Sequence, residues 1–128
     1  MNLKTKKIVG WSLSVLVALM LIASAIDKII GSAHALQMSA SFGISGNSYA
    51  TLGIIELVSA LLFLYSRTGI LGCFLLSSYL GGGIATHLQH GQGILFPAAI
   101  EALVWIAAVI RFPELLERIL AISKEKHT

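Results

Sequence analysis

Four long apolar runs dominate this sequence and limit what it can fold into. They cover residues 8–26, 48–66, 68–86 and 93–110, and only Glu56 and Glu101 interrupt them with a charge. A hydrocarbon core about 30 Å thick needs roughly 20 residues of α-helix, so each run is long enough for one crossing. Because unpaired backbone groups are costly in lipid, and these runs lack the alternation of barrel strands, we expect helices.

The predicted fold is therefore all-α, a transmembrane antiparallel four-helix bundle in one domain over residues 1–128. Hydrophobic residues make up 56% of the chain, charged residues 12%, and the mean hydropathy is +0.86. So small a protein keeps a large surface relative to its volume, and here that surface would be largely apolar. We expect the helices at about residues 8–30, 48–66, 68–87 and 93–111.

Lysine and arginine gather on one side of the predicted membrane. Only Lys28 lies in the segments on the other side; the remaining basic residues are Lys4, Lys6, Lys7, Arg67, Arg111, Arg118, Lys124 and Lys126. By the positive-inside rule, this places both termini in the cytoplasm and predicts a multi-pass protein of the cell membrane, inner or plasma. Because the charges flank apolar runs rather than forming a basic patch, we expect no nucleic-acid partner.

The connection between the first two runs is the longest. Ser32 is suited to N-cap a short helix over residues 33–42, closed by Gly43, which would lie at the outer interface above the bundle. An irregular loop fits the same residues equally well. Residues 4–25 also resemble a signal peptide, but the apolar run is longer than a usual signal core, so we expect the first helix to be retained.

Small residues recur at every fourth position of the third run, at Gly69, Cys73, Ser77, Gly81 and Ala85. Such a stripe allows close helix packing. We expect it to pack inside the monomer, and a homodimer interface is the alternative. Cys73 is the only cysteine, which excludes a disulfide, a paired-cysteine thiol oxidase and a Cys/His zinc site, and leaves the redox compartment undetermined.

Ionisable residues lie toward the outer side of all four predicted helices, at Asp27, Lys28, Glu56, His87 and Glu101. Glu56 and Glu101 both fall roughly 12 Å below the outer boundary at 1.5 Å per residue. An ionisable group in lipid costs at least ~2.5 kcal/mol and usually faces the bundle interior in a functional role. We therefore predict a polar pocket that binds a ligand or handles protons, with Trp105 beside Glu101 as a ligand wall or a core filler. The alternative is a buried knot of Lys28, Glu56 and His87 that only fixes helix register.

We predict no metal site. Neither glutamate has a histidine three residues later, as the di-iron motif of helix bundles requires. The sequence shows no nucleophile paired with a base and no phosphate loop, so no catalytic residue is predicted and no cofactor is evident.

Four stretches follow one another in an order and spacing that resemble a known family. They are Ser24-Ala-Ile-Asp-Lys28, Leu52-Gly-Ile-Ile-Glu-Leu57, Tyr79-Leu-Gly-Gly-Gly-Ile-Ala-Thr-His-Leu88, and Trp105 to Arg111 followed by Pro113. Together they resemble the DoxX-like family of small four-helix integral membrane proteins. The family pattern includes Lys28, Glu56 and His87, whereas Asp27 and Glu101 depart from it.

The resemblance implies relatives that include the membrane subunit of a thiosulfate:quinone oxidoreductase, a component of a bacterial oxidoreductase complex, and more distant assembly chaperones. Our first hypothesis is a subunit that binds a small quinone-like ligand, or an accessory subunit of a membrane oxidoreductase partner, rather than a stand-alone enzyme. The alternatives are an assembly or chaperone factor without catalysis and, less favoured, a proton-coupled transporter. The one partner expected in every case is the lipid bilayer.

Overall fold

The chain folds entirely into helices over the part that can be described. The computed structural model describes residues 1–121, so Lys124 and Lys126 of the basic set fall outside it. The helices are α1 (Leu3–Ile30), α2 (Ala33–Ser41), α3 (Gly46–Leu64), the short 3-10 helix η1 (Ser66–Thr68), α4 (Gly69–Gln89), α5 (Leu95–Arg111) and α6 (Pro113–Ile119). The predicted all-α class is confirmed.

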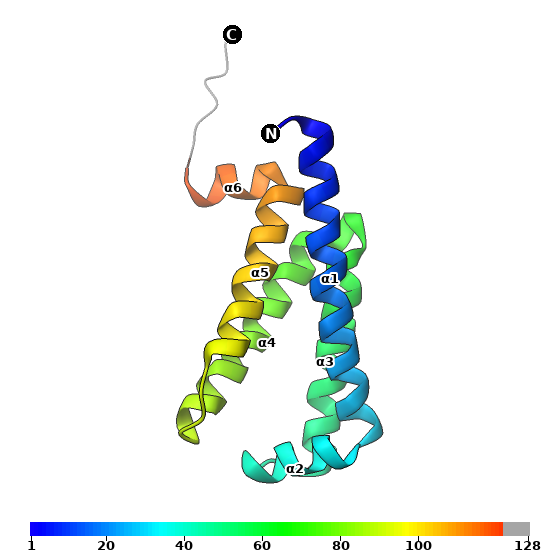
Figure 1. Ribbon diagram of the computed structural model, residues 1–128, viewed down its shortest axis with the longest axis vertical. Coiled ribbons are helices and arrows are strands. Elements are labelled where there is room, and N and C mark those ends of the chain that lie inside the picture. The colour runs from blue at the N-terminus through cyan, green and yellow to red at the C-terminus, as the bar shows by residue number, and fades with distance from the viewer. Residues whose placement is uncertain (122–128) are drawn as a thin grey trace.

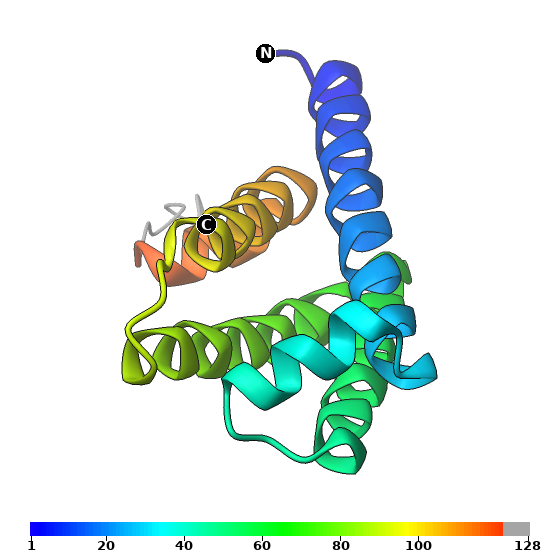
Figure 2. The same ribbon diagram turned by 60° about the horizontal axis from the view of Figure 1, so that its bottom comes forward.

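The long helices form two pairs that meet at one end and separate toward the other. Helix α1 packs along α3 and against α5, and α4 packs against α3 and α5. Figure 1 shows the pair α1 and α3 diverging from the pair α4 and α5, with α2 lying across the open end. Figure 2, with that end turned forward, shows α2 between the two pairs.

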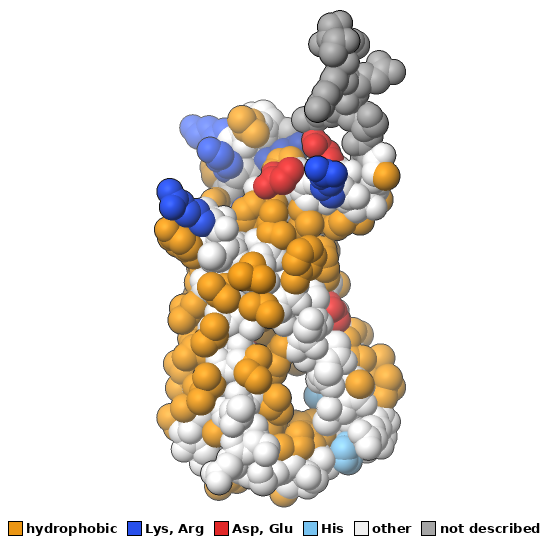
Figure 3. All heavy atoms as spheres, turned by 180° about the vertical axis from the view of Figure 1, so that it is seen from behind, with side chains coloured by type: hydrophobic (Ala, Val, Ile, Leu, Met, Phe, Trp, Pro, Cys, Tyr) orange, Lys and Arg blue, Asp and Glu red, His pale blue; other side chains and the backbone are white. Residues whose placement is uncertain are grey.

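The two ends of the molecule differ in charge. Lysine and arginine side chains gather where the N-terminus and α6 lie, as Figure 3 shows. We call this the basic end, made by Lys4, Lys6, Lys7, Arg67, Arg111 and Arg118, and the opposite one the α2 end. Helices α1 and α4 run from the basic end to the α2 end, and α3 and α5 run back (Figure 1).

Capping residues set the corner at the α2 end. Helix α1 ends at Gly31, whose φ of 66° is the left-handed conformation that glycine adopts without strain. The Ser32 hydroxyl then accepts a hydrogen bond from the Ala35 amide at 3.0 Å and N-caps α2. Gly43, with φ 67°, follows α2, and the Ser45 hydroxyl caps α3. Of the two alternatives for this connection, the structure has the short helix.

Helix α6 was not predicted from the sequence. Its first residue is Pro113, which disfavours a helical conformation at Phe112 and ends α5, but is well suited to begin a new helix. The chain bends by 110° between α5 and α6. Helices α1 and α3, and the segment formed by η1 and α4, are long and apolar enough to cross a membrane, and α5 with α6 would add a fourth if the bent pair is one span.

The tightest packing lies toward the basic end. A Cβ on Gly72 of α4 would lie 2.2 Å from the Phe63 backbone nitrogen, so α3 and α4 touch through their backbones there. Fully buried side chains such as Val17, Phe63 and Val104 form the core between the helices. This contact holds the two pairs together at one end and lets them separate at the other, where the candidate site lies.

Candidate functional site

A glycine brings α1 against α3 at the α2 end. A Cβ on Gly53 would lie 2.8 Å from both the carbonyl oxygen of Ala25 and the Cβ of Lys28, so only glycine allows this crossing. Glu56 follows three residues later, and this spacing puts it on the same face of α3, toward Lys28. The sequence therefore places a cation and an anion opposite each other where two backbones meet.

Lys28 and Glu56 form an ion pair in this crossing. The Lys28 ammonium donates to Glu56 Oε1 at 3.1 Å and to the Ser24 hydroxyl at 2.6 Å. The two side chains are only 12% and 3% exposed. Each charge thus compensates the other away from water, which a buried ion needs.

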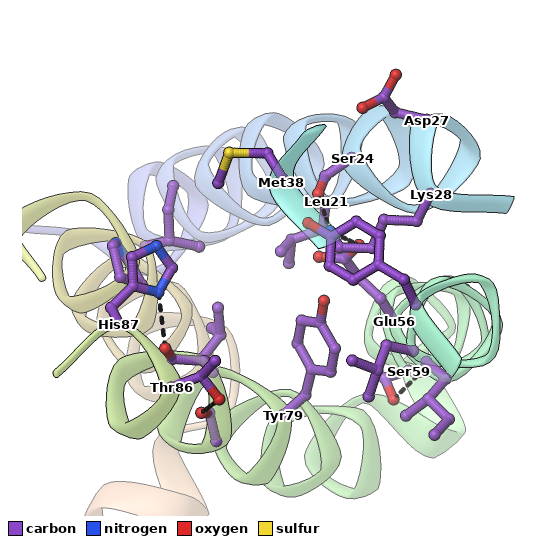
Figure 4. A pocket seen from close by; sticks show the side chains of 18 of the residues that line it. Leu21, Ser24, Asp27, Lys28, Met38, Glu56, Ser59, Tyr79, Thr86 and His87 are labelled. Atoms are coloured by element: carbon purple, nitrogen blue, oxygen red, sulfur yellow. Dashed lines mark hydrogen bonds and ion pairs between the residues drawn. The ribbon is translucent and has the colours of Figure 1, made fainter. Parts of the chain in front are cut away.

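Two tyrosines complete the surroundings of the ammonium. Its nitrogen lies 5.5 Å from the ring centroid of Tyr49 and 5.9 Å from that of Tyr79, within range for cation–π attraction. Figure 4 shows the Tyr79 hydroxyl directed into the pocket toward Glu56. Both tyrosines, and Ser24, were missed from the sequence. For Tyr79 the sequence did hold a signal. Tyr79 lies four residues before Gly83 and seven before Thr86, a spacing that puts all three residues on one face of a helix.

The ion pair borders a cavity of about 960 Å³ between the two helix pairs. That size is near the upper end of the range for pockets that bind small organic molecules. Figure 4 shows Lys28, Glu56 and Tyr79 on one side of it and His87 on the other. Apolar side chains from α1, α2, α3, α4 and α5 supply most of the remaining wall, among them Leu21, Met38, Leu52, Leu80 and Ile100.

His87 lines the cavity but is not bonded to the ion pair. Its Nδ1 lies 2.7 Å from the Gly83 carbonyl oxygen, an acceptor only, so we assign the proton to Nδ1. In the neutral imidazole Nε2 then remains as an acceptor. The ring centroid lies 4.9 Å from that of Phe42 at the end of α2. The structure thus brings Lys28 and Glu56 together, and places His87 across the cavity rather than in one knot with them.

Asp27 stabilises the corner between α1 and α2. Its carboxylate accepts a hydrogen bond from the Ser32 hydroxyl and lies 3.1 Å from His34 Nδ1. Asp27 and His34 also line the cavity. Because Ser32 is the residue that caps α2, the carboxylate has a structural role at this position.

Glu101 and Trp105 lie outside the cavity. Neither belongs to the residues that line it. Trp105 packs against the hydrophobic core, and its ring lies 6.2 Å from that of Phe74. Among the two roles considered for Trp105, this position is that of a core filler, and the two glutamates do not share one pocket.

The small-residue stripe of α4 divides in two. Gly69 and Cys73 are buried and Ser77 is half-buried, whereas Gly81 and Ala85 are exposed. A Cβ on Gly69 would meet the Phe112 ring at 2.3 Å, but one on Gly81 would meet nothing within 4 Å. The end of the stripe near Gly69 therefore packs inside the monomer, and the end near Ala85 does not.

Among residues 1–121, no group of three or more His, Cys, Asp or Glu side chains lies close enough together to hold a metal ion.

Comparison with known proteins gives one match. A sequence model of the DoxX-like family matches residues 12–109, about three quarters of the chain. No curated protein and no solved structure matches the chain. The matched region contains both residues of the ion pair and all of the residues that line the cavity.

Proposed function

The chain belongs to the DoxX-like family, and from this premise we propose that it is a cell-membrane protein whose cavity binds a small quinone-like ligand, serving as a ligand-binding or accessory subunit of a membrane oxidoreductase system. The observation that carries the proposal is the Lys28–Glu56 pair at the wall of a large apolar cavity. A pair that served only to fix helix register would need no such space beside it.

We also propose how the protein lies in the bilayer. It forms a single domain of four antiparallel spans, with α5 as the fourth and α6 lying along the membrane surface. The positive-inside rule puts the basic end, and with it both termini, in the cytoplasm. Lys28, the basic residue of the α2 end, is neutralised by Glu56 rather than exposed to solvent. The cavity then lies in the outer half of the membrane.

The chemistry of the cavity suits a neutral ring that carries carbonyl oxygens. A carbonyl near Lys28 and Tyr79 would find an ammonium and a hydroxyl as donors, while the apolar wall would receive the ring and its substituents. A charged ligand is disfavoured, because the ion pair is already balanced. His87 Nε2, across the cavity, would accept a hydrogen bond from a hydroxyl, as in the reduced quinol.

Redox turnover would require a partner protein. Cys73 is the only cysteine and is fully buried, so the chain has no dithiol that could exchange electrons with a quinone. We therefore assign Lys28, Glu56 and His87 to ligand binding and proton handling, and assign electron transfer to another subunit.

The test is binding of decyl-ubiquinone to the protein in lipid nanodiscs, measured by calorimetry. We expect wild-type protein to bind, and Glu56→Gln or Lys28→Met to weaken binding about tenfold or more, the effect of losing one charged hydrogen bond. Glu101→Gln makes the same carboxylate-to-amide change outside the cavity and should bind like wild type. Absence of binding by the wild type, or equal binding by Glu56→Gln, would contradict the proposal.

A second candidate, an assembly factor for other membrane proteins, is favoured by one observation. Gly81 and Ala85 expose the outer half of the small-residue stripe to the surroundings, where another helix would be able to pack closely. If the protein is an assembly factor, Gly81→Leu should abolish co-purification of another membrane protein and leave quinone binding intact. Variants that lose quinone binding should then keep their assembly function.

A further inference from the structure

The cavity opens to the surface of the protein on the side between α3 and α4. Ile55 of α3 and Leu75 of α4 both line the cavity, yet they are 48% and 39% exposed. Side chains that border the cavity and are also exposed mark the edges of an opening. Figure 3, which views the molecule from this side, shows the surface hollowed between the two helices in the half near the α2 end.

Glycines of α4 keep this opening wide. Gly82 and Gly83 line the cavity, and a Cβ on either would meet nothing within 4 Å. They therefore do not serve helix contact, unlike Gly72 on the same helix, whose Cβ would lie 2.2 Å from Phe63. Glycine is unfavourable inside a helix, and here the absent side chains leave a passage rather than a packing surface.

The opposite side of the cavity, between α1 and α5, also has exposed edges. Met20 and Phe96 line the cavity there and are 38% and 70% exposed. Both side chains are large, and a flexible methionine can cover a gap. On the α3–α4 side, Ser78 and Gly82 offer little to cover it. The α3–α4 side is therefore the opening with the smaller side chains at its edge.

We propose that this opening, the lateral portal formed by Ile55, Leu75, Ser78, Gly82 and Gly83, admits the ligand sideways from the lipid and holds its apolar tail. The inference rests on the proposed function and names its ligand class: a quinone with a long apolar chain. The head lies against Lys28 and Tyr79, and the tail passes over Gly82 to the acyl chains. Three facts favour a tail as the occupant: the portal is continuous with the head site, it opens between two apolar spans, and the cavity is larger than one ring requires.

The experiment compares two quinones on two variants in nanodiscs. The probes are decyl-ubiquinone and its tail-free head, dimethoxy-methyl-benzoquinone. Gly82→Leu places a side chain in the portal, whereas Gly81→Leu makes the same change on the neighbouring residue, which does not line the cavity. We expect Gly82→Leu to weaken decyl-ubiquinone binding about tenfold, the effect of one badly placed side chain. The tail-free head should change less than about twofold, and Gly81→Leu should bind both like wild type.

Folding is checked on each variant through Cys73, which is fully buried and should resist a thiol reagent in any folded protein. If Gly82→Leu fails to fold, Gly82→Ala provides a smaller change at the same position. Gly82→Ala should weaken the binding of decyl-ubiquinone and leave the binding of the tail-free head unchanged. Equal weakening of both quinones by Gly82→Leu, or no weakening of either, would overturn the portal. Tight binding of the tail-free head by wild type, with no gain from the tail, would leave the proposed function intact and refute the portal. A wild type that binds neither quinone would refute both.

Discussion

Glycine allows close helix packing near the basic end, whereas the glycines of α4 toward the α2 end leave space beside them. A Cβ on Gly10, Gly69 or Gly72 would meet a neighbouring helix or its side chains within 3.2 Å, whereas one on Gly81, Gly82 or Gly83 would meet nothing within 4 Å. The first group allows backbones to touch, and the second leaves space beside a cavity. Identical residues on one helix, α4, therefore have opposite consequences that depend on where the partner helix lies.

Two half-buried cations repeat this contrast. At the basic end, the Arg111 guanidinium lies 4.1 Å from the Trp11 ring centroid and 4.6 Å from that of Phe112. One of its nitrogens donates to the Phe63 carbonyl oxygen at 2.5 Å and to that of Leu64 at 3.3 Å, so it caps the C-terminus of α3. Lys28 is likewise flanked by aromatic rings, but its partner is a carboxylate and it borders the cavity.

The two cations differ in what they bind. Arg111 donates to carbonyl oxygens that the end of a helix leaves without partners, so the fold alone explains its position. Lys28 pairs with the Glu56 carboxylate, a charge that helix packing does not require. A buried ion pair can often be replaced by apolar residues at little cost to stability. We therefore propose that this pair serves the cavity beside it, whereas Arg111 serves the fold.

The largest effect should come from breaking the ion pair on one side only. Lys28→Met leaves the Glu56 carboxylate buried without its cation, and should lower the free energy of unfolding by about 3 kcal/mol or more. The double variant Lys28→Met with Glu56→Gln removes both charges and should recover most of that loss while still failing to bind quinone. Stability is measured in detergent by the temperature at which Cys73 begins to react with a thiol-reactive dye.

Recovery of stability without recovery of binding would identify the pair as a functional element. If the double variant is as unstable as Lys28→Met, the pair acts mainly in folding, and the distinction from Arg111 is lost.

A smaller effect is expected at the basic end. Arg111→Met keeps an apolar stem among the aromatic rings but removes the donor to the end of α3, and should lower the free energy of unfolding by about 2 kcal/mol. Quinone affinity should stay within about twofold of wild type, because Arg111 does not line the cavity. The same dye assay and the same calorimetry measure both.

Arg67→Met is the matched control, since Arg67 is an exposed basic residue near the same end of α3. An exposed site of this kind should change stability by no more than about 0.5 kcal/mol. Loss of quinone binding in folded Arg111→Met would contradict the assignment of this cation to structure alone.

The sequence predicted the helices better than their arrangement, for reasons visible in particular residues. Long apolar runs and the capping residues Ser32 and Gly43 act locally, so the helices and the short α2 followed from them. Depth in the membrane grouped Lys28 with Glu56 and His87, because all three lie toward one end of their helices, but it did not indicate which of them form an ion pair. Which way a side chain faces around its helix depends on neighbours distant in sequence, so Glu101 was grouped with a cavity that it does not reach.

Tyr79, Gly72 and the bend at Pro113 were missed for related reasons. Tyr79 gains its importance from Lys28, on another helix, and Gly72 gains its importance from the Phe63 backbone. The spacing of α4 places Tyr79 on one face with Gly83 and Thr86, but it does not indicate which neighbouring helix that face, or Gly72, will meet. The proline did carry a local signal, the usual one for a helix boundary, but the apolar residues after it were too few to be recognised as a separate helix.

The smallest effect concerns the attachment of α2 across the α2 end. Phe42 contacts the rings of His87 and His90, with centroids 4.9 Å and 5.9 Å away, and so links the end of α2 to the end of α4. Phe42→Leu keeps a large apolar side chain at this buried position but removes the ring contacts, and should lower stability by only about 1 kcal/mol, the worth of an aromatic pair. It should, however, raise hydrogen exchange selectively over residues 33–41, because the Phe42 ring links the end of α2 to the end of α4.

Leu36→Ala, on the exposed side of the same helix, should leave exchange in α2 close to wild type. Since the proposed ligand enters through the lateral portal and not past α2, Phe42→Leu should change the association rate of decyl-ubiquinone less than Gly82→Leu does. A rate that rises strongly in Phe42→Leu and is unaffected by Gly82→Leu would instead make α2 the entrance. The glycines of α4 near the α2 end would then have no role in ligand entry and would only reduce helix stability. The difference between the glycines of the two ends would in that case concern helix packing alone.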